Sequence, residues 1–304
     1  MDRTSGEVGW CGCPGLPPVA HVMLHHWEEP CLSGTRGSGA VFFGGCNLRC
    51  VFCQNHDISV RPVGEPHSPD ALADVFLRLQ ESGAHNVNLV SPTPYSGYIA
   101  RALTAARDRG LEIPVVYNCN GYETVEALRR LDGLVDVYLP DLKYFDETLA
   151  RRFSSAPRYF ETASAALLEM DRQVGEAVFD QAGLMKKGML VRHLVLPGHT
   201  ADSARLLEWL AANLPRAHLS LLAQYTPVHR AREFGELARR LSPLEYEPLV
   251  DLCERLGLER GYRQEIEAAD EAYIPDFPSR SRPATDTPGS GSEADGSEAG
   301  GPGP

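Results

Sequence analysis

Between residues 40 and 222 the chain repeats one pattern, in which a short apolar run is followed by a polar turn and a stretch of helical periodicity. The apolar runs are nearly continuous rather than alternating, which is typical of strands buried on both faces. Repeated strand–helix units predict an α/β fold with a parallel sheet and right-handed crossovers. The predicted strands are 40–44, 86–90, 113–117, 135–139, 189–196 and 218–222.

Helices are predicted between and after these strands. An apolar stripe at helical spacing follows Ser68–Pro69, a second stripe covers 206–210, and a capping-box pattern at Ser242 predicts a helix through about Leu256. Such units fit either a partial TIM-type barrel or an open doubly wound sheet. In both folds the chemistry lies at the carboxyl ends of the strands.

Composition divides the chain into three segments. Residues 1–38 contain Cys, Gly and Pro with little periodicity, so we expect an irregular leader. Residues 39–278 carry the strand–helix pattern and are expected to form one domain. Residues 279–304 consist largely of Pro, Gly, Ser, Ala and acidic residues. This segment cannot bury enough apolar surface to offset its ordering entropy, so we expect a disordered tail.

The formal net charge of −12 disfavours nucleic acid as a partner. No apolar run approaches the ~18 residues that suggest a membrane span. The N-terminus lacks the basic region and apolar stretch of a secretory signal. We therefore expect a cytoplasmic protein without a membrane partner. In that reducing compartment, clustered cysteines are metal ligands more often than disulfides.

The strongest local signal is the C-x3-C-x2-C spacing of Cys46, Cys50 and Cys53, directly after the first predicted strand. A [4Fe-4S] cluster usually takes four thiolates, so three cysteines leave one iron open. An open iron can chelate the amino and carboxylate groups of S-adenosylmethionine (SAM). The alternative is a zinc site with His56 as fourth ligand.

The aromatic residue Phe52 precedes the last cysteine, and this C-x3-C-x-aromatic-C pattern resembles that of the radical SAM superfamily. Over residues 6–277 the chain is similar to the PflX-type branch, proteins that resemble the activating enzymes of pyruvate formate-lyase. The segments that carry this similarity are 28–30, 33–39, 42–43, 53–55, 58–59, 140–143, 195–199 and 273–277.

The resemblance implies a partial (β/α)6 TIM-type barrel for residues 39–278, and it implies that Phe52 packs near the SAM adenine. It also makes Asn118 and Asn120 candidate SAM contacts, although Asn-Gly is also a common turn pair. By the same resemblance Asp141 and Lys143 surround the methionine part of SAM, where a carboxylate and an ammonium suit a zwitterion. A solvated loop pair is the other interpretation of these two charges.

One segment departs from the activating enzymes, which carry Gly-Gly-Glu after the second strand. Here the chain reads Val-Ser-Pro-Thr-Pro at 90–94, and the PflX-type branch has a similar Pro-Thr segment. Ser91 and Thr93 are the candidates that replace the motif through carbonyls or hydroxyls.

The resemblance implies an oxidoreductase-type enzyme that binds a [4Fe-4S] cluster and reductively cleaves SAM to a 5′-deoxyadenosyl radical. Its expected partners are a reductant such as flavodoxin or ferredoxin and an unidentified substrate, with a glycyl radical protein as the leading candidate. The alternative is a Zn or Fe-S binding or maturation protein without radical chemistry.

Three further cysteines, Cys11, Cys13 and Cys31, are a weak ligand set for a second metal. The PflX-type branch often has another cysteine group further upstream, so we expect that this chain begins late. Cys253 lies inside a predicted helix and is expected to be a buried core thiol.

Overall fold

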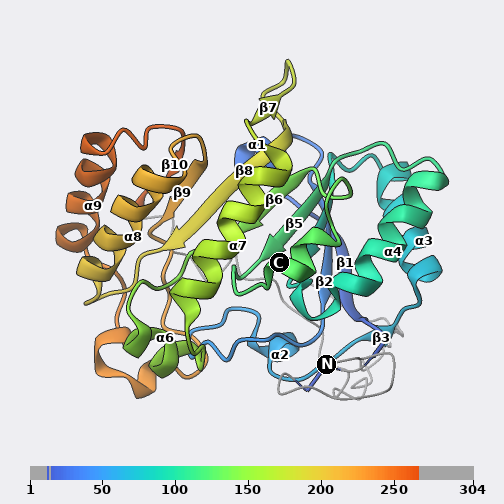
Figure 1. Cartoon of the computed structure of the whole chain (residues 1–304). Helices are drawn as coiled ribbons and strands as arrows, with labels where there is room; N and C mark the ends of the chain where they lie inside the picture. The colour runs from blue at the N-terminus through green and yellow to red at the C-terminus, as the bar shows by residue number, and fades with distance from the viewer. Residues whose placement is uncertain (1–11, 14, 267–304) are drawn as a thin grey trace, which may run out of the picture.

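The computed structural model describes residues 12, 13 and 15–266 (Figure 1). The predicted tail at 279–304 and most of the first half of the predicted leader lie outside the described residues. All six predicted strands are present, five with shifted ends and the last, 218–222, with the predicted bounds. They are β2 Ser38–Phe43, β4 Val87–Val90, β5 Val115–Cys119, β6 Val137–Pro140, β8 Met185–Leu194 and β9 His218–Leu222.

The order of the strands distinguishes a partial TIM-type barrel from an open doubly wound sheet, both of which are compatible with the sequence. The six strands lie in the order β9-β8-β6-β5-β4-β2, and each is parallel to its neighbour. A doubly wound sheet would reverse this order at a switch point. Because the order follows the chain without reversal, successive crossovers wind the same way, and the predicted partial barrel is confirmed.

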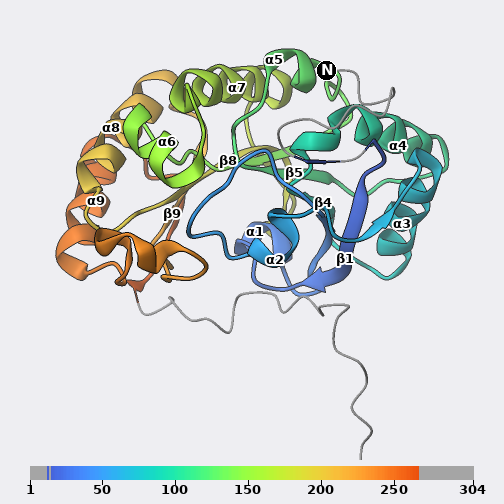
Figure 2. The same ribbon diagram turned by 90° about the horizontal axis from the view of Figure 1, so that it is seen from below.

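Helices cover the outer face of this curved sheet. Figure 2 shows α3, α4, α5, α7, α8 and α9 in an arc, with α1 and α2 on its concave side. The helices are α1 Pro30–Ser33, α2 His56–Ser59, α3 Pro69–Glu81, α4 Ser96–Asp108, α5 Val125–Arg129, α6 Glu147–Ser154, α7 Tyr159–Val174, α8 Thr200–Asn213 and α9 Pro243–Arg255; short 3-10 turns are η2 Thr93–Tyr95, η3 Ala231–Glu233 and η4 Gly235–Leu237.

The helix-start signals in the sequence are used as predicted. The Ser68 side chain accepts a hydrogen bond from the backbone N–H of Ala71 at the start of α3. Ser242 and Glu245 form a reciprocal capping box at the start of α9. Each cap satisfies backbone N–H groups that have no partner within the first helical turn.

The second half of the predicted irregular leader is ordered into strand β1 (Pro18–His25), which pairs antiparallel with β2. Pairing covers the hydrogen-bonding edge that β2 would otherwise expose. Histidines at 21 and 25 interrupt the apolar pattern, which is why this segment does not read as a strand. Shorter strands complete the sheet: β3 Glu65–Pro66 beside β1, β7 Val178–Phe179 beside β8, and β10 Gly261–Arg263 parallel to β9.

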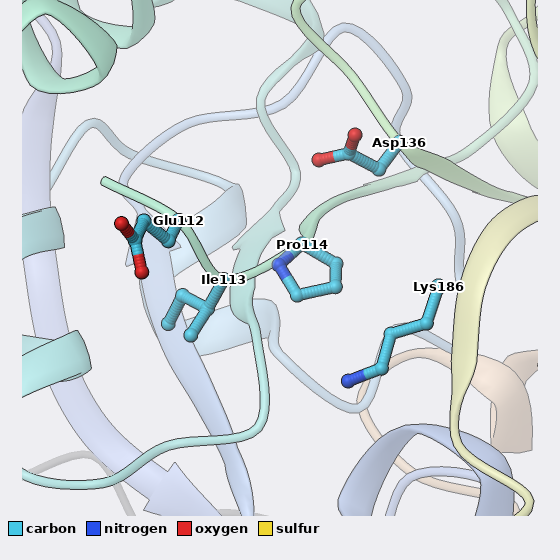
Figure 3. Close-up of a pocket in the computed structure, with 5 residues that line it drawn as sticks. All are labelled: Glu112, Ile113, Pro114, Asp136 and Lys186. Atoms are coloured by element: carbon cyan, nitrogen blue, oxygen red, sulfur yellow. The ribbon is translucent and has the colours of Figure 1, made fainter. Parts of the chain in front are cut away.

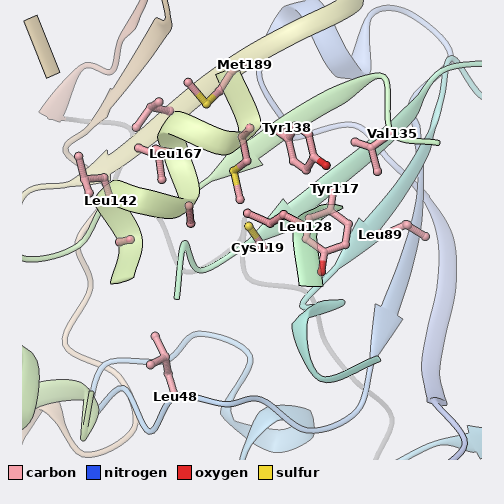
Figure 4. Close-up of a cluster of buried hydrophobic side chains, with 14 of the residues drawn as sticks. Leu48, Leu89, Tyr117, Cys119, Leu128, Val135, Tyr138, Leu142, Leu167 and Met189 are labelled. Atoms are coloured by element: carbon pink, nitrogen blue, oxygen red, sulfur yellow. The ribbon is translucent and has the colours of Figure 1, made fainter. Parts of the chain in front are cut away.

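The main core lies between the sheet and the helix arc (Figure 4). Tyr117 of β5 and Tyr138 of β6 meet there edge to face, with ring centroids 5.9 Å apart. Neighbouring paired residues of parallel strands point to the same side of the sheet, so these rings pack in one layer. Both side chains are fully buried and stabilise the wall behind the candidate site.

A second, smaller core fills the concave side at the amino ends of the strands. Cys31 and Leu32 of α1 pack there on Val116, Val137 and Leu190. Helix α1 therefore closes the barrel at this end, much as layers of side chains fill complete barrels. The carboxyl ends of the strands remain as the open end.

Candidate active site

A cavity of about 540 Å³ opens on the concave side of the sheet at the carboxyl ends of the strands. Its volume is within the range of small-molecule sites. The lining comes from the loops after β2, β4, β5 and β6, from β8, β9 and β10, and from the segment between β1 and α1. Strand register brings these parts to one level, since Phe42 pairs with Val90, Val90 with Asn118, and Asn118 with Leu139.

The cysteine loop follows β2 and needs glycine at its first turn. Gly45 adopts φ 84°, in the left-handed region, and donates its N–H to the carbonyl of Ile58 at 2.7 Å. A Cβ at this position would stand 2.6 Å from Cys13 Sγ. Only glycine therefore allows the chain to turn from β2 into the loop that carries the three cysteines.

The three predicted cluster ligands, Cys46, Cys50 and Cys53, all line the cavity. Burial raises the pKa of Cys46 to about 11 and that of Cys53 to about 12, and it also raises the pKa of Cys50. Thiols in this environment stay protonated at neutral pH unless a cation compensates the thiolate charge. A bound metal supplies that compensation and deprotonates coordinating thiols.

His56, the fourth ligand in the zinc alternative, does not line the cavity. Its Nδ1 lies 3.1 Å from the carbonyl oxygen of Cys53, and its Nε2 lies 3.4 Å from an Asp57 carboxylate oxygen. The ring also stacks on His229 at a centroid distance of 4.8 Å. Both ring nitrogens thus contact oxygens, one of the Cys53 backbone and one of Asp57.

Asn118 and Asn120 line the cavity from the carboxyl end of β5. Asn120 Nδ2 lies 3.4 Å from Cys46 Sγ and donates to Asn47 Oδ1 at 2.7 Å. The turn interpretation also holds, because the Asn120 side chain accepts the N–H of Tyr122 at 3.0 Å. Asn120 therefore shapes the turn and contacts the cysteine loop at the same time.

Asp141 and Lys143 follow β6 and face the same cavity, where they form a 2.7 Å ion pair. The side chains are 31% and 16% exposed, so this is not a solvated surface pair. Burial disfavours the charged form of Lys143, but the adjacent Asp141 outweighs this effect and raises the lysine pKa above its usual value. The cavity thus presents a carboxylate and an ammonium side by side.

Buried groups behind this pair fix its position. The Tyr159 hydroxyl accepts the N–H of Lys143 at 3.0 Å and reaches the carbonyl oxygens of Asn120 and Asp141 at 2.9 and 3.0 Å. His193 Nδ1 lies 2.6 Å from the carbonyl oxygen between the two charged residues, and burial lowers the His193 pKa to about 4. The ring is therefore neutral and donates through Nδ1 to that carbonyl.

Ser91 and Thr93, the two residues predicted to replace the Gly-Gly-Glu motif, take different positions in the loop after β4. Ser91 lines the cavity with φ 59°, a left-handed conformation that is uncommon outside glycine. Thr93 belongs to the turn η2 and lies outside the cavity lining. Strained residues of this kind gather at functional sites, so Ser91 is the residue that this loop presents to the cavity. Phe52 also lines the cavity and contacts the Tyr225 ring, with centroids 5.9 Å apart.

Beneath these residues lies a charged group to which the sequence analysis gave no role. Arg192 of β8 donates Nε to Glu29 Oε1 at 2.8 Å and also pairs with Glu28. Glu28 Oε1 accepts from Asn88 at 2.8 Å and from Asn118 at 3.3 Å. All three charges line the cavity floor. The available signal was an arginine directly after the apolar run Met189–Val191.

The described cysteines outside the C-x3-C-x2-C motif that the sequence analysis considered do not form a group with one another. Cys13 packs in the main core against Gly45, while Cys31 is in the inner core with α1. Cys11 is outside the described residues. Cys253 is fully buried in α9, as expected of a core thiol.

A second, more open pocket of about 360 Å³ lies at the amino ends of the strands. Figure 3 shows its lining, with Pro114 before β5, Asp136 before β6 and Lys186 at the start of β8. In barrel enzymes this end serves stability rather than chemistry. Asp136 illustrates that use, because it accepts the N–H of Val115 at 2.8 Å and pairs with Arg107.

Comparison with known proteins identifies the family. The sequence model of the Radical SAM superfamily matches residues 40–210. The uncharacterized protein MJ0674 of Methanocaldococcus jannaschii is 33% identical over 251 residues, which cover 79% of this chain and 68% of that protein.

Among solved structures, Streptococcus suis SuiB bound to S-adenosylmethionine is similar with a TM-score of 0.53, at 14% identity over 74% of this chain. Coproporphyrinogen III oxidase (HemN) of Escherichia coli, a radical SAM enzyme, has a TM-score of 0.50 at 14% identity over 77% of this chain. The match spans 50% of SuiB and 57% of HemN, so the likeness covers about half of those chains. Within the described residues, no helix is both long and apolar enough to cross a bilayer.

The buried group of Arg192, Glu28 and Glu29 leads us to predict a specific effect on stability. Burial alone would raise the pKa of Glu29, but the charge of Arg192 and its hydrogen bond outweigh burial and hold that pKa below its usual value. Arg192→Met leaves buried carboxylates without a cation, which we expect to lower the free energy of unfolding by about 3–5 kcal/mol at pH 7. Urea unfolding measures the loss, with the exposed pair member Arg109→Met as control.

The pH dependence of this loss has a defined sign. In the wild type, Glu29 contributes to the free energy of unfolding above its unfolded-state pKa. This contribution is lost as the pH falls through the lowered folded-state pKa. In Arg192→Met, burial raises the Glu29 pKa, so the variant gains stability as the pH falls from 7 toward 5. The difference between the two proteins should therefore shrink on acidification. A difference that is constant or grows over this range would contradict the ion-pair account.

Proposed function

The chain belongs to the radical SAM superfamily, and from this membership we propose that it holds a [4Fe-4S] cluster through Cys46, Cys50 and Cys53 and reductively cleaves SAM. One observation carries the proposal: three thiols with the superfamily's spacing face a single cavity together with a carboxylate–ammonium pair. When bound, the cluster supplies the electron that splits SAM into methionine and a 5′-deoxyadenosyl radical.

The residues present fit a [4Fe-4S] cluster, which is larger than a single metal ion. Thiolates that hold a [4Fe-4S] cluster each bind a different iron and therefore surround a larger volume. A cavity of about 540 Å³ with three thiols along its wall suits that larger group and SAM beside it.

In this proposal, different residues of the cavity bind different parts of SAM. Lys143 and Asp141 offer opposite charges to the carboxylate and amino groups of the methionine part. Ser91 takes the place of the Gly-Gly-Glu segment, while Thr93 acts through the turn behind it. Asn118 and Asn120 contribute amides, and Phe52 offers an apolar surface to the adenine.

Cleavage also needs a one-electron reductant, for which flavodoxin or ferredoxin is the expected class. The alternative function, a Zn or Fe-S binding protein without radical chemistry, uses the same cysteines. Formation of 5′-deoxyadenosine by the reduced, cluster-loaded protein separates the two functions, because only radical chemistry produces it.

Replacing any one of Cys46, Cys50 or Cys53 with Ala should abolish the brown cluster and the formation of 5′-deoxyadenosine. Iron and sulfide analysis after anaerobic reconstitution measures the first effect, and chromatography of the reaction mixture measures the second. Cys253→Ala is the matched control, because that thiol is fully buried in α9. Loss of the cluster in the Cys253 variant alone, or no SAM cleavage by the loaded wild type, would overturn the proposal.

Asp141→Asn should weaken SAM binding by about 10- to 150-fold, because a hydrogen bond to a charged group contributes about 1.5–3 kcal/mol. Anaerobic calorimetric titration of the cluster-loaded variant with SAM measures the dissociation constant. Glu112→Gln, at the opposite end of the barrel, is the control for an acid-to-amide change. An unchanged dissociation constant for Asp141→Asn would remove this residue from the SAM site.

For the substrate, we propose activation of a glycyl radical partner protein, on the basis of the sequence similarity to the PflX-type branch. Reduced, cluster-loaded protein mixed with SAM and pyruvate formate-lyase should then give the electron paramagnetic resonance (EPR) doublet of a glycyl radical. The Cys50→Ala variant is the control and should give no doublet. Formation of 5′-deoxyadenosine without the doublet would refute this partner and leave SAM cleavage standing.

A further inference from the structure

Each of the three sulfur atoms of the cysteine loop, those of Cys46, Cys50 and Cys53, has a polar side chain within hydrogen-bonding distance. Asn120 Nδ2 lies 3.4 Å from Cys46 Sγ, and Ser59 Oγ lies 3.3 Å from Cys53 Sγ. The shortest of the three contacts is at Cys50, where Ser154 Oγ lies 3.0 Å from Sγ. Ser154 is more than a hundred residues away in sequence and belongs to none of the motifs discussed above.

The fold fixes the position of Ser154 relative to Cys50. Ser154 is the last residue of α6, and its carbonyl accepts the N–H of Arg49 at 3.0 Å. The carbonyl of Phe153 accepts the N–H of Val51 at 2.8 Å. These two bonds flank Cys50 on both sides, so the cysteine loop is attached to the end of α6 at the point where the hydroxyl meets the sulfur.

A second hydroxyl stands behind the first. Tyr144 Oη lies 2.7 Å from Ser154 Oγ, and both residues are fully buried. A thiolate at Cys50 can only accept, so Ser154 must donate its proton toward the sulfur. The phenol keeps its proton at neutral pH and therefore donates to Ser154. The direction of both hydrogen bonds follows from the charge at the sulfur.

We propose that Tyr144 and Ser154 form a hydrogen-bond relay to Cys50 that raises the reduction potential of the cluster. Reduction adds negative charge to the cluster and its sulfurs, and hydrogen bonds to the sulfurs stabilise that charge. Hydrogen bonds in a chain polarise one another, especially in a buried environment. Tyr144 thus acts on the cluster through Ser154 and is a positioning residue rather than a ligand.

This inference rests on the proposed function, because it requires that Cys50 bind the cluster. The two proposals nevertheless fail separately. Iron content and the EPR signal of the reduced cluster test ligation. The reduction potential, measured only on samples with a full cluster, tests the relay.

The test compares the wild type with Ser154→Ala, Tyr144→Phe and the double variant after anaerobic reconstitution. Reduction potentials come from a dithionite titration with redox mediators, followed by EPR. Both single variants should shift to more negative potential, and Ser154→Ala should shift further. The double variant should match Ser154→Ala, because Tyr144 has no route to the cluster once the serine hydroxyl is gone.

Tyr138→Phe is the matched control, because its buried hydroxyl bonds Gln173 at 2.6 Å instead of the cysteine loop. Its potential should equal that of the wild type. Unchanged potentials in both relay variants, or shifts that simply add in the double variant, would overturn the relay. If Ser154→Ala fails to hold the cluster, the reduction potentials of Tyr144→Phe and Tyr138→Phe are compared instead. Each variant loses one phenol hydroxyl, and only the loss at Tyr144 should change the potential if the relay operates.

Discussion

Two backbone hydrogen bonds hold the cysteine loop against the end of α6, from Arg49 to Ser154 and from Val51 to Phe153. Leu48, Val51 and Phe52 of this loop are buried in the main core, and contacts with neighbouring elements set the rest of its geometry. Gly45 sets its entry, α6 sets its middle, and the amide of Asn47 bonds the carbonyl of Tyr122 at 2.8 Å. The positions of all three thiols follow from these contacts with neighbouring parts of the barrel.

The loops after β5 and β6 are joined to one another in the same way. A Cβ on Gly121, which has φ 73°, would stand 2.4 Å from the carbonyl oxygen of Asp141, so the two loops touch through backbone. The Tyr159 hydroxyl bridges them from the helix layer. The carboxylate–ammonium pair and the asparagine amides are therefore held as one unit, and the rigid sheet beneath carries it. Preorganised groups of this kind lose little entropy when a ligand binds.

The parts of this structure that the sequence predicts are those with a local cause. Six buried strands follow from continuous apolar runs, α9 follows from the capping box at Ser242, and the thiols follow from their spacing. Strand β1 escapes prediction because its pattern is broken by histidines and its stability comes from pairing with β2. Arg192 and Glu29 lie 163 residues apart, and Ser154 and Cys50 lie 104 apart. Contacts over such separations depend on strand order, which no local pattern encodes.

The interior charges and hydroxyls follow one physical rule. A buried polar group is costly unless it has a partner, and a buried charge is more costly still. In the cavity, Arg192 is matched by Glu28 and Glu29, and Lys143 by Asp141. Ser154 and Tyr144 satisfy each other, but a two-hydroxyl pair leaves one donor over. The Cys50 sulfur lies where that donor points. Electron-rich sulfur is a better acceptor than a neutral thiol, so this pair is best satisfied when the loop carries thiolates. Under the proposed ligation, this hydroxyl pair therefore suits a thiolate at Cys50 better than a protonated cysteine.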